Sequence, residues 1–250
     1  MVTIAIIGLL ISIVMPALYK ARQNGKLSAC RAHLSQLGLA IIVYADQNYE
    51  LIPRGPACVG PFDFTCADVA TNQLWIGAEN ELHPNEPNGL GVLIKSHNIN
   101  TKIYFCPADD SNNLEEELPR IGSDLDAYGS YTYRQLDQLP GRKRGKLSNL
   151  GANVVDDVQV PVEALALDTN SLGPGPFRHT NHRAKKVNVL YRDRSVQTFP
   201  NKLGTFSIPP ETFESPEKIF TRLDQILVNA DYGYRQNPES APQIEAEEDP

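Results

Sequence analysis

The first residues of the chain restrict its fold and location more than any other segment. Residues 2–18, VTIAIIGLLISIVMPAL, contain no charged side chain. A membrane-spanning helix takes about 20 apolar residues, so this run is slightly short. A secretory signal would begin with basic residues, whereas here the first cations follow the run. A buried core helix usually keeps a polar face. The pattern therefore favours a membrane anchor over a cleaved signal or a core helix.

An amphipathic segment follows the apolar run. Its apolar residues recur at alternating spacings of three and four, which is the period of one helical face: Leu27, Cys30, Leu34, Leu37, Ile41 and Tyr44. We therefore expect one helix from residue 2 to about 48, roughly 70 Å long. Pro16 is expected to bend it, and Asn24-Gly25 is a second weak point. Residues 1–22 form its transmembrane part, and residues 23–50 form the part that packs on a globular domain.

The remaining chain indicates a globular domain over residues 51–235 and a disordered acidic tail over 236–250. Residues 52–103 are rich in proline and are predicted to be mostly loop, with a short helix or strand at 88–96. A helix is expected at SPEKIFTRLDQILVNA, with Ser215 as its N-cap and Pro216 next. Strands are predicted at Lys102–Cys106, Gly129–Arg134, Ala164–Asp168, Val187–Tyr191 and Ser195–Phe199. The predicted fold class is α+β, a long N-terminal helix packed on a small, mostly antiparallel sheet.

The four cysteines form neither a CxxC pair nor a cluster with zinc-like spacing, so no structural zinc site is predicted. An even count behind an export-type segment indicates two disulfides. Cys58 and Cys66 bracket a short loop and pair with each other, which leaves Cys30 to pair with Cys106. The alternative is that they are buried free thiols in a cytosolic protein.

Few residues suggest chemistry. His179 and His182, with Asp168 or Asp193, could ligate a metal, although two solvated histidines in a polar loop are the preferred interpretation. The oxygen-rich residues 108–113 could hold Ca²⁺, but they lack the EF-hand pattern, and a solvated turn is preferred. No nucleophile elbow, phosphate loop or dinucleotide fingerprint is present. The net charge of −7 argues against a nucleic-acid partner. We therefore predict no enzymatic activity, no catalytic or cofactor-binding residues and no metal or other cofactor, with Ca²⁺ as a weak alternative.

Four segments in this order resemble the type IV pilin and type II secretion pseudopilin superfamily, in particular its prepilin-like group from planctomycete-type bacteria. They are the apolar run, CRAHLSQLGLAIIVYADQNYELIP, YFCPAD at Tyr104–Asp109 and NVLYRDRSVQTF at Asn188–Phe199. Two features depart from that group. The Gly/Phe cleavage site and the glutamate after it are absent, and Arg194 stands where the group has glycine. We expect about six mature residues and a basic leader upstream of Met1. Because Arg194 would be strained at positive φ, a wider turn or a turn of another type is expected there.

The resemblance implies a non-enzymatic, single-pass subunit of a type II secretion or type IV pilus-like filament. It implies an inner-membrane location with the globular domain in the periplasm, and as partners the membrane, other pilin or pseudopilin subunits, and a prepilin peptidase if a leader exists. The alternative is a tethered extracytoplasmic binding or enzymatic domain that uses the helix for export. The membrane and filament residues are Ile4, Ile6, Ile7, Leu9, Leu10, Ile13, Val14 and Pro16. The helix-docking residues are Leu27, Leu34, Leu37 and Ile41.

Overall fold

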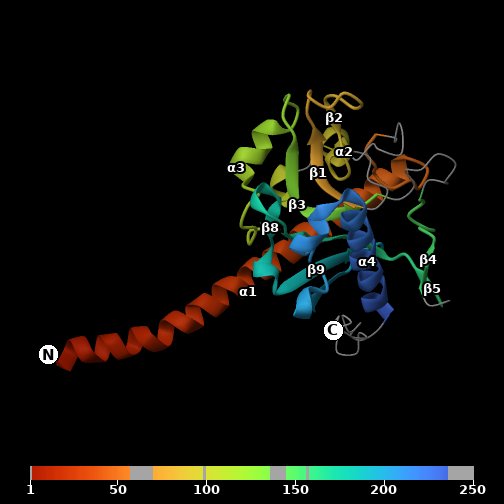
Figure 1. Cartoon of the computed structure of the whole chain (residues 1–250). Coiled ribbons are helices and arrows are strands. Elements are labelled where there is room, and N and C mark those ends of the chain that lie inside the picture. The colour runs from red at the N-terminus through yellow and green to blue at the C-terminus, as the bar shows by residue number, and fades with distance from the viewer. Residues whose placement is uncertain (1, 57–69, 98–99, 136–144, 156–157, 236–250) are drawn as a thin grey trace.

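The computed structural model describes residues 2–56, 70–97, 100–135, 145–155 and 158–235 of the 250-residue chain. Helix α1 (Val2–Gln47) is continuous through Pro16 and Gly25. Its first half projects away from the globular part, and its second half lies along that part (Figure 1). The predicted single helix is therefore confirmed. The predicted tail at 236–250, Cys58 and Cys66 lie outside the described residues.

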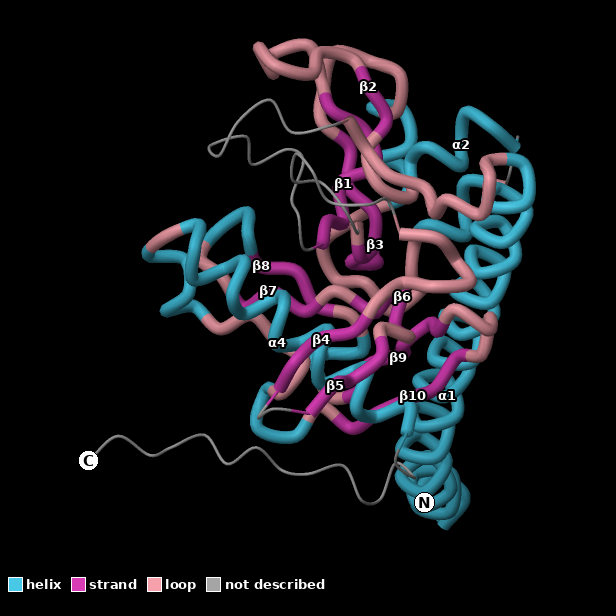
Figure 2. The backbone as a smooth tube through the Cα atoms, turned by 90° about the vertical axis from the view of Figure 1, so that its right-hand side faces the viewer, coloured by secondary structure: helices cyan, strands magenta, loops and turns pink. Residues whose placement is uncertain are grey.

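The globular part is built on a six-stranded sheet in which every pairing is antiparallel, in the order β10-β9-β6-β3-β1-β2. An α+β layout with a mostly antiparallel sheet is thus confirmed, and Figure 2 shows α1 running past the strands. The six strands are β1 (Ala70–Ile76), β2 (Glu86–Pro87), β3 (Ala127–Arg134), β6 (Ala164–Asp168), β9 (Lys186–Tyr191) and β10 (Val196–Pro200).

Smaller elements surround this sheet. Two further antiparallel hairpins pair β4 (Ala152–Val155) with β5 (Val158–Pro161) and β7 (Asn170–Leu172) with β8 (Arg178–Thr180). The other α-helices are α2 (Gly91–His97), α3 (Leu114–Glu117) and α4 (Pro216–Arg235). Short 3-10 turns lie at Thr101–Tyr104, Leu118–Arg120, Gly175–Phe177, His182–Ala184, Lys202–Gly204 and Pro210–Glu214.

Four of the five predicted strands are present, as β3, β6, β9 and β10. The prediction of a strand at Lys102–Cys106 is wrong, because Thr101–Tyr104 form a 3-10 helix with Asn100 as its N-cap. The Asn100 side chain accepts a hydrogen bond from the Lys102 backbone amide at 3.1 Å, which caps this turn. Strand β1 lies in the segment predicted to be loop. Its polar first half, ATNQ, hides the alternation that identifies a strand, and its pairing with β3 is non-local.

The sheet is covered by α1 on one face and α4 on the other. Successive side chains of a strand point to opposite faces. In β9, Val187, Val189 and Tyr191 therefore belong to the core under α4, while Leu190 belongs to the core under α1. Helix α4 begins as predicted, with Pro216 first and the Lys218 amide donating to Ser215 Oγ at 3.4 Å.

The β9–β10 hairpin turns at Arg194, which adopts a φ of 70°. Arg194 itself thus adopts the positive φ at which strain was expected. The Ser195 amide donates to Asp193 Oδ1 at 2.8 Å, and the Arg194 amide donates to the Tyr191 carbonyl at 2.9 Å. These hydrogen bonds offset the cost of placing a non-glycine residue in the left-handed region.

Close packing of α1 on this hairpin requires glycine at position 38. A Cβ there would lie 2.8 Å from Leu190 Cδ1 and 2.9 Å from Arg194 Cγ. We expect Gly38→Leu to lower the free energy of unfolding by about 1–3 kcal/mol through overpacking, measured by urea denaturation. Gly25 is the matched control, because nothing lies within 4 Å of a Cβ at that helical position. Gly25→Leu should stabilise the helix by up to about 1 kcal/mol. Equal effects of the two substitutions would contradict the docking geometry.

Candidate functional site

The part of α1 that projects from the globular part begins with the apolar run, residues 2–18, which we call the arm. The arm exposes large apolar side chains all around the helix. Ile6 and Ile7, Leu10 and Ile11, and Ile13 to Met15 are neighbours in sequence, and consecutive helical residues point about 100° apart. All of them are at least half exposed, and so is Leu18. A helix that packs on a soluble core leaves only one stripe apolar. The structure does not describe the side chains of Ile4 and Leu9, although both lie within α1.

Within the described chain, α1 is long and apolar enough to cross a membrane, by length and composition. Among the described residues, the large apolar side chains from Ile6 to Leu18 belong to neither of the two buried cores. Exposed apolar surface of this extent is typical of a membrane or protein contact.

The second half of α1 buries one stripe against the sheet. Leu34, Leu37 and Ile41 are fully buried in the core that also contains Tyr131, Leu165 and Leu190. Leu27 is only half-buried and lies outside that core, so the tight contact of α1 begins near Cys30.

A buried polar cluster lies where α1 meets the sheet. Its members are Cys30 from α1, Cys106 from the loop after the Thr101–Tyr104 turn, Asp168 at the end of β6 and His182 from the His182–Ala184 turn. These residues are far apart in the sequence: Cys30 and Asp168, for example, are separated by 138 positions. The fold places all four on the α1 side of the sheet.

Short contacts join the four side chains. Cys30 Sγ donates to Asp168 Oδ1 at 3.0 Å, and Cys106 Sγ lies 3.4 Å from His182 Nε2. His182 Nε2 in turn lies 3.5 Å from Asp168 Oδ2. One potential ligand atom from each residue lies within 4.8 Å of the other three. Cys30 and Cys106 are free thiols in this structure, so the predicted disulfide between them is not formed there.

Neighbouring groups hold the cluster in place. Asp168 Oδ2 accepts hydrogen bonds from the Asn188 backbone amide at 2.7 Å and from Asn188 Nδ2 at 2.9 Å. Thr198 Oγ1 donates to Asn188 Oδ1 at 2.6 Å, which fixes the orientation of that side-chain amide. The Ala108 amide donates to Cys106 Sγ at 3.4 Å, and Tyr131 Oη lies 3.4 Å from Cys30 Sγ.

Burial shifts the pKa values of Asp168, Cys30 and His182 toward their neutral forms. It raises the pKa of Asp168 to about 7, a shift that hydrogen bonds from Cys30 and Asn188 oppose. It raises the pKa of the Cys30 thiol well above its usual value. Burial, together with the charges of Lys26 and Lys186, lowers the pKa of His182 to about 4. His182 is therefore neutral at pH 7, and the Cys30 thiol keeps its proton.

The structure separates the two histidines that the sequence placed together. His182 meets Asp168, whereas His179 Nδ1 lies 3.4 Å from Asp109 Oδ1 and 3.1 Å from Ser111 Oγ. Asp193 caps the β9–β10 turn instead of facing either histidine. Sequence reasoning missed Cys30 and Cys106 as neighbours of His182, because it sought ligands at short spacing. The signal that could have found them is the expected proximity of Cys30 to Cys106.

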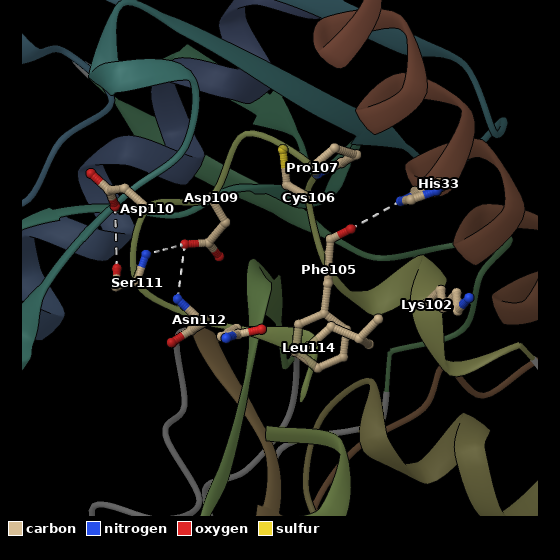
Figure 3. Close-up of a pocket in the computed structure, with 11 residues that line it drawn as sticks. His33, Lys102, Phe105, Cys106, Pro107, Asp109, Asp110, Ser111, Asn112 and Leu114 are labelled. Carbon is tan, nitrogen blue, oxygen red and sulfur yellow. Dashed lines mark hydrogen bonds between the residues drawn. The ribbon is translucent and has the colours of Figure 1, made fainter. Parts of the chain in front are cut away.

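The oxygen-rich segment 108–113 lines a surface cavity of about 410 Å³ between α1 and α3 (Figure 3). Asp109 Oδ1 accepts hydrogen bonds from the backbone amides of Ser111 and Asn112, at 2.9 and 3.0 Å. Asp110 accepts hydrogen bonds from the Thr180 amide and hydroxyl. These carboxylates close a turn and fasten it to β8, which is a structural role for the residues that were the weak Ca²⁺ alternative. Cys106 and His33 also line this cavity, so it reaches the edge of the buried cluster.

Comparisons with protein-family models, with curated proteins and with solved structures found no match to this chain.

Proposed function

We propose that the chain is a pseudopilin-like structural subunit of a type II secretion or type IV pilus-like filament. The observation that carries this proposal is one continuous helix with two different environments. Its arm exposes apolar side chains on all sides, and its second half is docked on an antiparallel sheet. The arm would lie in the inner membrane until the subunit enters a filament, with the globular domain on the periplasmic side.

An apolar arm would suit both the membrane-bound subunit and the subunit within a filament. In lipid the arm is solvated by acyl chains, and in a filament the arms of neighbouring subunits replace those chains. No charged side chain has to be buried in either state, because residues 6–18 carry no charge. The partners would be the membrane, further copies of this chain and related subunits, and a prepilin peptidase if a leader precedes the apolar run.

Self-assembly through the arm separates this proposal from a tethered binding or enzymatic module. A cysteine at Met15, which is 68% exposed, places a reactive thiol on the arm. In liposomes holding the full chain, a bismaleimide should link Met15→Cys into dimers and higher oligomers. Val158→Cys, exposed on β5, is the matched control and should give far fewer products. The unmodified chain reports any background from its own cysteines. Monomeric Met15→Cys at high protein density would contradict a filament role and favour the tethered module.

A further inference from the structure

The buried cluster has the composition of a metal centre. Two thiols, an imidazole and a carboxyl group converge where α1 meets the sheet, and all four residues are buried. We propose that Cys30, Cys106, Asp168 and His182 bind one Zn²⁺ ion that joins α1 to the sheet. The proposal does not depend on filament assembly.

Ligand type and geometry both favour zinc. Sulfur and imidazole ligands suit Zn²⁺, whereas Ca²⁺ requires six to eight oxygen atoms. In a tetrahedral zinc site the ligand atoms lie about 3.3–3.8 Å from one another. The contacts from Cys30 to Asp168, from Cys106 to His182 and from His182 to Asp168 are 3.0, 3.4 and 3.5 Å. Small side-chain movements would therefore bring all four atoms onto one ion.

Hydrogen bonds from neighbouring residues hold the proposed ligands in position. Asn188 donates twice to Asp168 and is itself fixed by Thr198, which leaves Asp168 Oδ1 directed at Cys30. Such outer hydrogen bonds orient metal ligands. The Ala108 amide donates to Cys106 Sγ and would stabilise its thiolate.

Backbone strain at His182 supports the same conclusion. His182, Arg183 and Ala184 have φ values of 50°, 56° and 53°, all in the left-handed region. Non-glycine residues are strained in this region, and such strain clusters at functional sites. Buried Asn181 anchors the turn by donating to the carbonyls of Ser130 and Thr169 at 2.6 and 3.1 Å. The turn brings the His182 ring to Cys106 and Asp168.

Zinc binding releases protons from the ligands. Each thiol releases a proton as its Zn–S bond forms, and Asp168 binds in its carboxylate form. Neutral His182 contributes Nε2 without losing a proton. Two thiolates, one carboxylate and one neutral imidazole around Zn²⁺ leave one net negative charge on the site.

The test uses the full chain, reduced and stripped of metal. Titration with Co²⁺ should produce the visible bands of a tetrahedral thiolate site that saturate at one equivalent, and one equivalent of Zn²⁺ should abolish them. Millimolar Ca²⁺ should have no effect. His182→Asn removes the ring and keeps a residue that tolerates positive φ. Loss of a ligand should weaken Zn²⁺ binding by more than the roughly 10–100-fold expected for the outer-shell variant Thr198→Val.

Asp168→Asn distinguishes loss of metal from loss of fold. Its amide oxygen can accept both Asn188 hydrogen bonds, and the buried charge is removed, so the metal-free variant should melt at or above the wild-type temperature. Zinc should raise the melting temperature of the wild type but not of this variant. His33→Asn and the Cys58→Ser/Cys66→Ser double variant are controls and should bind cobalt as the wild type does. Three results would each overturn the proposal. Asp168→Asn could bind the metal as tightly as the wild type, or the folded, reduced chain could show no cobalt bands. The third is a Cys30–Cys106 disulfide in the chain as isolated.

Discussion

Asp231→Ala is expected to lower the free energy of unfolding by about 3–5 kcal/mol, because it leaves a buried guanidinium without its counter-charge. Arg134 Nη1 lies 2.8 Å from Asp231 Oδ2, and both side chains are almost fully buried. Asp231 also accepts hydrogen bonds from Asn153 Nδ2 and from the backbone amides of Glu163 and Ala164. One carboxylate thus fastens α4 to β3, β4 and β6.

Urea denaturation of the purified chain measures this effect. Glu214→Ala is the matched control, because it removes an exposed partner of Lys218 and should leave the urea midpoint unchanged. The double variant Asp231→Leu/Arg134→Met replaces the buried pair by apolar side chains and should recover part of the loss. If Asp231→Ala and Glu214→Ala had the same urea midpoint, the buried pair would not be what holds α4 on the sheet.

Leu10→Lys, or Ile7→Lys, is expected to abolish retention of the chain in a membrane. Both side chains are more than half exposed on the arm of α1, in a run that contains no other charge. Placing lysine near the centre of a spanning helix costs about 2.5–3.5 kcal/mol, and the favourable transfer of Leu or Ile is lost as well. The short run leaves little apolar length to offset that cost.

Flotation of the reconstituted chain with phosphatidylethanolamine–phosphatidylglycerol liposomes measures retention. Wild type should float with the lipid and resist alkaline extraction, while each lysine variant should stay in the soluble fraction. Ala21→Lys is the control. It lies beside Lys20 and Arg22, where a long cationic side chain reaches the headgroups, and it should float normally. Normal flotation of Leu10→Lys would refute the anchor.

Elements with a regular local pattern could be predicted from the sequence. Helix α1 follows from its continuous apolar run and the stripe after it, and α4 from its Ser-Pro start and its helical spacing of apolar residues. Strands β6 and β9 are short apolar runs bounded by turns, which identifies buried strands. β1 and the Thr101–Tyr104 turn could not be predicted, because their conformations depend on pairing with β3 and on one capping side chain.

The sequence also predicts one part of the candidate site, the apolar arm, but not the other, the buried cluster. The apolar arm is contiguous in sequence, so hydropathy alone identifies it. The buried cluster draws Cys30, Cys106, Asp168 and His182 from four separate segments, and no spacing rule connects them. Expecting Cys30 close to Cys106 was correct, but the chemistry expected of the pair was a disulfide.

Sequence by itself thus determined the long helix, its apolar arm and the antiparallel α+β class, because each rests on periodic patterns among neighbouring residues. Only the tertiary structure decided which polar side chains meet beneath α1. The pleat of β9 turns Asn188 toward Asp168, and the left-handed turn at 182–184 brings His182 to Cys106. Long-range packing sets these contacts, because burial of the apolar faces positions the strands and their polar side chains follow.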